Sequence, residues 1–100
     1  MQGLGQALYE HAVYDDDGQL VSGSFMDYAM PRADQVADVD VDFNEVLDPN
    51  NELGVKGIGE GGACAAPSAV VNAVLDAMAC RGVETIDMPM TPLRVWQALQ

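Results

Sequence analysis

A single carboxylate lies inside a glycine-rich segment at residues 55–62, which reads Val-Lys-Gly-Ile-Gly-Glu-Gly-Gly. Four of the last six residues are glycine, so the backbone can approach a bound group closely or adopt positive φ angles. The turn fixes the direction of Glu60, and a carboxylate partly removed from water is suited to accept a proton as a general base. The segment is therefore the candidate site for chemistry.

Other interpretations of this segment compete with the general base. Residues 57–62 match the dinucleotide-binding pattern GxGxxG, but residues 50–54 form a turn where that fold needs a buried strand. Glu60 would also place a negative charge beside a pyrophosphate. A Walker loop is excluded because no Gly-Lys-Ser/Thr follows the glycines. A third interpretation, a helix entry loop whose glycines only relieve crowding, stays open.

The aspartates at 15–17, followed by Gly18, suggest a calcium loop, but the spacing argues against it. Aligning Gly18 with the invariant glycine of an EF-hand places Val13 and Ser24 at the first and last ligand positions, where carboxylates are needed. An acidic hairpin turn is the better interpretation. We expect no protein-ligated metal site in this chain.

The composition limits the partners. Sixteen acidic residues against four basic ones give a net charge of −12, which disfavours nucleic acids and anionic membrane surfaces. We see no apolar run that reaches the roughly 18–20 residues of a membrane span. Cys64 and Cys80 form no CxxC pair, so we expect a reducing, cytoplasmic setting and small buried thiols.

Hydrophobic periodicity and turn signals predict an α+β fold. We expect one small domain over residues 1–100, with a β-hairpin and further short strands packed against two or three helices. The helices are expected at 1–10, from Pro67 to about Cys80 with Gly82 as the residue that ends it, and after the Thr91-Pro92 cap. The extended segments are expected around the Asp17-Gly18 turn, at the alternating residues 38–43 and at 83–88. Trp96 is expected to face the core.

Several segments in the same order resemble the C-terminal part of the large subunit of molybdenum hydroxylases. These segments are residues 2–10, 24–31, 54–60, 66–74 and 86–92. The family includes xanthine dehydrogenase, aldehyde oxidoreductase and aerobic carbon monoxide dehydrogenase, and the carbon monoxide dehydrogenase branch looks nearest. The resemblance implies a C-terminal fragment of a molybdopterin-binding domain.

The resemblance also implies roles for individual residues. Glu60 corresponds to the active-site glutamate beside the molybdenum, which takes a proton from a hydroxyl on the metal. Gln2 corresponds to a glutamine near the molybdopterin, and Lys56, Gly57, Ile58 and Gly59 approach the cofactor mainly through their backbone. Electrons then leave through iron–sulfur and flavin subunits or domains. The implied reaction is the oxidative hydroxylation or oxidation of a small substrate.

The chain departs from that family in length, because a complete large subunit is several times longer. It lacks most of the loops that hold the cofactor, so we expect this chain alone to be inactive and not to retain molybdopterin. Its expected partner is the remainder of the large subunit. A second hypothesis is a non-catalytic module that binds a partner or self-associates through surfaces that the rest of the subunit would cover.

Overall fold

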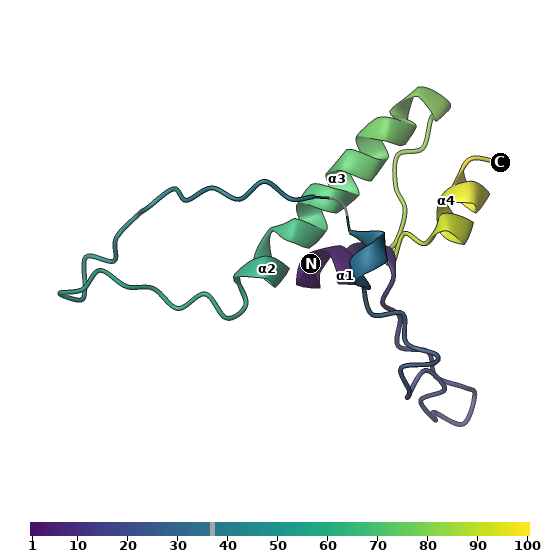
Figure 1. The fold of residues 1–100 in the computed structure, drawn as a ribbon. Helices are drawn as coiled ribbons and strands as arrows, with labels where there is room; N and C mark the ends of the chain where they lie inside the picture. Colours follow the sequence, from purple (N-terminus) through teal and green to yellow (C-terminus); the bar gives the residue numbers. More distant parts are fainter. Residues whose placement is uncertain (37) are drawn as a thin grey trace.

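A computed structural model describes residues 1–36 and 38–100, and its regular structure is helical (Figure 1). The α-helices and 3₁₀ helices (η) follow one another as α1 Gln2–Leu8, η1 Ala33–Gln35, α2 Gly61–Cys64, α3 Ala66–Met78, η2 Ala79–Arg81 and α4 Pro92–Ala98. The α1 helix lies across the start of α3 and also contacts α2. Two excursions leave this helical body. One lies between α1 and η1, and the other, hereafter the long excursion, lies between η1 and α2.

The expected α+β fold is wrong. In the described part of the chain there is no sheet, and the only β pairing is an isolated antiparallel bridge between Tyr14 and Leu20. The acidic turn does form, because the Asp15 carboxylate accepts backbone N–H groups of Asp17 and Gln19 and Gly18 has φ of 79°. Its arms do not continue as strands. Residues 38–43 are extended but pair with no strand among the described residues.

The helix boundaries follow local signals, as predicted. Thr91 caps α4, since its side-chain oxygen accepts the backbone N–H of Arg94 at 3.4 Å, and Pro92 occupies the first helical position. Gly82 ends the helical stretch after η2 in the left-handed region, with φ of 75°. A side chain there would be strained, which explains the glycine.

The core is small and lies where α1, α3 and the segment before α4 meet. Its buried apolar residues, among those the structure describes, are Ala7, Met78 and Met90. The Met90 N–H donates to the Ala7 carbonyl oxygen at 2.7 Å and ties this segment to the end of α1. Trp96 is 58% exposed, so the expectation that it faces the core is wrong for this chain.

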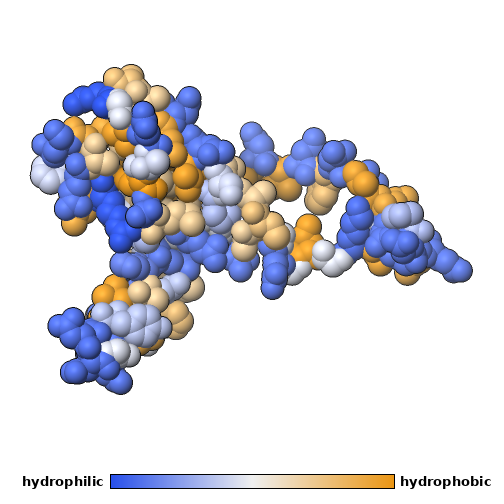
Figure 2. Space-filling view, turned by 180° about the vertical axis from the view of Figure 1, so that it is seen from behind, coloured by the Kyte–Doolittle hydropathy of each residue, from blue (hydrophilic) through white to orange (hydrophobic). Residues whose placement is uncertain are grey.

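The molecule exposes far more surface than a compact domain of its size. Its accessible surface is 8181 Å², against about 5,500 Å² for a compact monomer of this mass. Its radius of gyration is 17.4 Å, against about 13 Å for a compact domain of 100 residues. Apolar side chains lie in the open on both excursions and on the helical body (Figure 2).

The helical stretch Gly61–Arg81 is long and apolar enough to span a membrane, contrary to the expectation that no run would qualify. This finding rests on length and composition alone, and the core helices of soluble proteins pass the same test. Here α1 packs against α3, so one side of the stretch contacts another helix.

Candidate functional site

Glu60 lies at the start of α2, where the glycine-rich segment turns into a helix. Its backbone carbonyl accepts the Ala63 N–H at 2.9 Å and the Cys64 thiol at 3.3 Å, so its backbone is fixed. Its side chain makes no capping bond to the helix and is exposed. The carboxylate is therefore free to contact a group outside this chain. Cys64 is also exposed, so the expectation of a buried thiol is wrong.

Gln2, the first residue of α1, lies beside this turn. A Cβ atom placed on Gly62 would be 3.8 Å from both the Cβ and the amide oxygen of Gln2. Fifty-eight positions separate Gln2 from Glu60, and the contacts between α1 and α2 bring their backbones together. The structure thus brings Gln2 beside the helix α2 that Glu60 precedes.

The remaining expected cofactor-binding residues form an open strip of backbone before Glu60. Lys56, Gly57, Ile58 and Gly59 are all exposed. Within the described residues, no backbone N–H from Lys56 to Glu60 donates a hydrogen bond. A Cβ on Gly57 or Gly59 would meet nothing within 4 Å. The free N–H donors and the open space at Gly57 and Gly59 fit a polar group that contacts the backbone directly.

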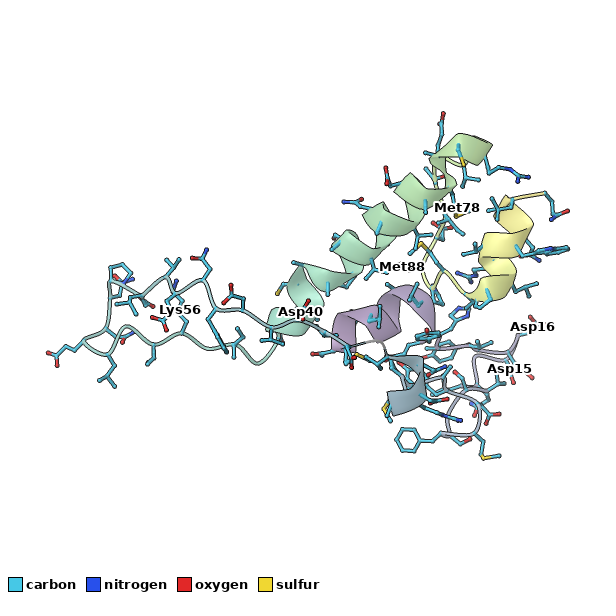
Figure 3. All side chains as sticks on the ribbon, turned by 45° about the horizontal axis from the view of Figure 1, so that its top comes forward. Asp15, Asp16, Asp40, Lys56, Met78 and Met88 are labelled. Carbon is cyan, nitrogen blue, oxygen red and sulfur yellow. The ribbon has the colours of Figure 1, made fainter. Side chains whose placement is uncertain are left out.

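The charges on the long excursion are mostly negative. Figure 3 places Lys56 on the outlying part of this excursion, away from the helical body. Among the residues that the structure describes, no cluster of three or more His, Cys, Asp or Glu side chains could hold a metal ion.

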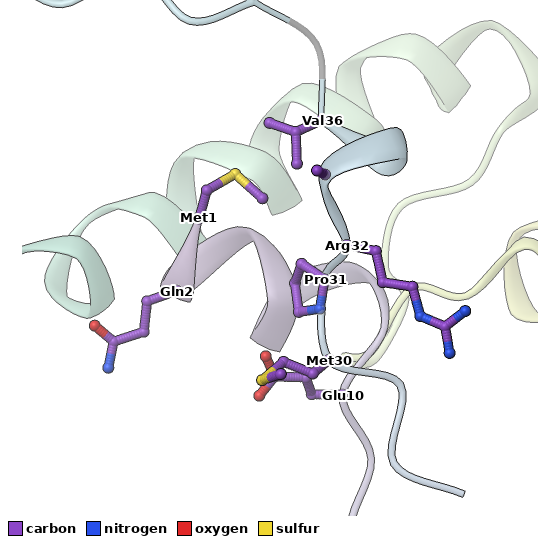
Figure 4. Close-up of a pocket in the computed structure, with 8 residues that line it drawn as sticks. Met1, Gln2, Glu10, Met30, Pro31, Arg32 and Val36 are labelled. Carbon is purple, nitrogen blue, oxygen red and sulfur yellow. The ribbon is translucent and has the colours of Figure 1, made fainter. Parts of the chain in front are cut away.

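A cavity of about 400 Å³ opens beside α1 (Figure 4). Met1, Gln2, Glu10, Met30 and Pro31 are among its lining residues. The Tyr28 hydroxyl donates to the Glu10 carboxylate at 2.6 Å, and this bond, with smaller contributions from desolvation and from the negative charge, raises the pKa of Tyr28 above its usual 10.0. Gln2 lines this cavity and also lies beside Gly62, so it borders both the cavity and the turn that holds Glu60.

Two glycines in α1 pack closely against other segments, Gly3 against α2 and α3 and Gly5 against the segment before η1, and the sequence pattern singled out neither. A Cβ on Gly3 would meet the Gly62 carbonyl oxygen at 2.5 Å and the Pro67 Cδ at 2.7 Å. A Cβ on Gly5 would meet the Pro31 ring at 2.7 Å. The available signal was energetic, because each glycine inside a helix costs about 0.5–1 kcal/mol relative to alanine. Two in seven residues therefore indicate close packing.

Comparison with known proteins places this chain in a class. Residues 1–37 match a family described as a molybdopterin cofactor-binding domain. The chain is 43% identical to the gamma subunit of a 6-hydroxypseudooxynicotine dehydrogenase complex and 39% identical to a nicotine 6-hydroxylase large subunit, both from Paenarthrobacter nicotinovorans. These matches cover 100% and 98% of the chain. The chain matches the molybdopterin-binding region of molybdenum hydroxylase large subunits, as the resemblance implied.

The structural comparison agrees. The fold superposes on quinoline 2-oxidoreductase from Pseudomonas putida 86 with a TM-score of 0.88 and 41% identity over 98% of the chain. A carbon monoxide dehydrogenase large chain from Hydrogenophaga pseudoflava is 31% identical, less than the two nicotine enzymes, so the expected nearness of that branch is not supported.

The match is to a fragment of these subunits. The chain spans only 13% and 12% of the length of the two nicotine enzymes and 12% of the quinoline enzyme. The names of the relatives and the matched domain support a molybdenum–molybdopterin cofactor in the parent protein. One relative is a subunit of a dehydrogenase complex, which indicates partner subunits for proteins of this class.

Proposed function

We propose that this chain forms one wall of the active site of a molybdenum hydroxylase large subunit and supplies its general base, Glu60. The observation that carries the proposal is the contact between α1 and α2, which brings Gln2 beside the turn that holds Glu60. The reaction of the complete subunit is the oxidative hydroxylation or oxidation of a small substrate. Residues 1–100 act as one C-terminal portion of its cofactor-binding domain, in the cytoplasm.

Each residue has a distinct task in this proposal. The cofactor, when bound, supplies the metal and accepts electrons from the substrate. Glu60 accepts a proton on its carboxylate, and hydrogen bonds to its carbonyl oxygen fix the backbone from which that side chain extends. The Gln2 amide donates to the cofactor, and the free N–H groups of residues 56–59 bind its polar atoms. Iron–sulfur and flavin subunits or domains carry the electrons away.

The site is open to water in this chain, which indicates that other segments must complete it. A general base works best where water is excluded, because electrostatic interactions strengthen there. Glu60 and Gln2 are both exposed, and the strip before Glu60 lies in the open. The remainder of the large subunit would cover these residues, and the chain alone would be inactive.

Substitution of Glu60 in the complete subunit tests the proposal. Glu60→Gln keeps the size of the side chain and removes its ability to accept a proton, so we expect turnover to fall by about 10²–10⁴-fold. Molybdenum content should not change. Glu52→Gln is the matched control, since Glu52 is an exposed carboxylate on the same excursion. Turnover near the wild-type value in Glu60→Gln, with molybdenum retained, would refute the assigned role.

The excess surface favours a second candidate function, in which the separate chain self-associates without catalysis. The surface exceeds that of a compact monomer by roughly 2,700 Å², and a stable interface needs only about 800 Å² from each partner. Phe43, 82% exposed on the long excursion, is a candidate contact. Light scattering should show a molar mass that rises with concentration, and Phe43→Ser should weaken that rise. A monomer at every concentration tested would exclude this function.

A further inference from the structure

The α1 helix approaches α2 and α3 so closely that only glycine fits at residue 3. A Cβ on Gly3 would lie 2.5 Å from the Gly62 carbonyl oxygen, 2.7 Å from the Ala66 Cβ and 2.7 Å from the Pro67 Cδ. Distances under 3.0 Å are essentially never seen for real Cβ atoms. The opposing atoms belong to backbone, a Cβ and a proline ring, and none of them can rotate away.

A side chain at residue 3 would therefore move the helix. Ordinary contact between carbon atoms begins at about 3.5 Å, so α1 would have to retreat from α2 by roughly 1 Å. Gln2 is the adjacent residue and lies against Gly62, at the start of the same helix α2 that Glu60 precedes. A retreat of α1 therefore changes the position of Gln2 relative to Glu60.

We propose that Gly3 is a positioning residue, which sets the spacing between Gln2 and the turn that carries Glu60. The inference rests on the proposed function, because it assumes that this spacing matters for the reaction. Gly3 itself contacts neither substrate nor cofactor. It acts by allowing two backbones to meet where any side chain would separate them.

Gly5, in the same helix, provides a contrast. Its missing Cβ faces the Pro31 ring, at 2.7 and 2.9 Å, and the Glu10 carboxylate. A side chain there would also crowd α1, but against the segment before η1 and not against α2. The two glycines therefore separate a change in the Gln2–Glu60 spacing from a general loss of packing.

The experiment compares Gly3→Ala with Gly5→Ala in the complete subunit. We expect both variants to lower Tm by similar amounts and to retain molybdenum. Gly3→Ala should lower kcat by about 10²-fold, the typical effect of a 1 Å misplacement, with KM changed much less. Gly5→Ala should keep kcat close to the wild-type value. Equal kcat values in the two variants would overturn the proposal.

A double-mutant cycle identifies the residue through which Gly3 acts. If Gly3 works by placing Gln2, then Gly3→Ala should have little further effect on kcat in a Gln2→Ala background. Fully additive effects would overturn the proposal. Should Gly3→Ala fail to fold, Ala66→Val enlarges the facing residue and should lower kcat in the same direction. A failure of the proposed function is seen separately, because Glu60→Gln would then leave kcat unchanged.

Discussion

Met90 fastens the segment before α4 to the helical body, and its truncation gives the largest stability effect expected in this chain. Its side chain is 2% exposed and its N–H donates to Ala7 at 2.7 Å. Because few apolar residues are buried, few neighbours can repack to fill the cavity that truncation of this side chain leaves. Met90→Ala should cost about 2–5 kcal/mol, the usual range for a buried methionine.

Hydrogen exchange with mass spectrometry measures this cost where it arises. A loss of 2 kcal/mol corresponds to roughly 30-fold faster exchange if local opening limits the reaction. We expect this acceleration at the amides of residues 88–92 and at the end of α1. The control is Met26→Ala, since Met26 is 93% exposed and its truncation should change stability by less than about 0.5 kcal/mol. Equal exchange rates in the two variants would refute the claim that Met90 anchors the segment.

Three further outcomes follow from local contacts. Tyr28→Phe should remove from the ultraviolet difference spectrum a phenol whose pKa lies above 10.0. Because folding raises this pKa, the Tyr28 hydroxyl stabilises the fold fully below pH 10.0, and this stabilisation is lost as the pH rises through the pKa of the folded state. A titration at or below 10.0 would contradict the bond to Glu10. Thr91→Ala should cost about 0.5–1 kcal/mol in urea denaturation by removing the cap of α4, whereas Thr91→Ser should not. Gly82→Ala should cost about 1 kcal/mol from backbone strain alone, since its Cβ would meet nothing within 4 Å; an unchanged midpoint would contradict the left-handed conformation.

The features that the sequence predicted correctly depend on residues a few positions apart. The cap at Thr91, the left-handed Gly82 and the acidic turn at residues 15–18 each involve the local backbone and one or two side chains. Such signals act wherever the rest of the chain lies. They therefore hold in a chain that has only a small core.

The features predicted wrongly depend on distant partners. Residues 38–43 alternate between aspartate and apolar residues, a pattern typical of a half-buried strand, but a strand also needs a neighbouring backbone. No described segment of this chain provides one. Trp96 has the size and position of a core anchor but finds too little core to enter. Both patterns suit surroundings larger than this chain.

The candidate site was only partly predictable. Glu60 stood out because a carboxylate among four glycines is unusual, and the roles of Gln2 and residues 56–59 came from the resemblance. Those roles remain predictions. No spacing rule could have placed Gln2 beside Gly62, because their proximity depends on how α1 lies across α3. The close packing at Gly3 likewise becomes visible only in three dimensions.

The contact between α1 and α2 has a consequence for the order of folding. It closes a loop of about sixty residues, so the chain loses the conformational entropy of that loop before the contact can stabilise the fold. The helices α2 and α3 are neighbours in the sequence and can form first. Gln2 therefore meets the Glu60 turn among the last steps, so a nascent chain would hold both residues well before it holds a site.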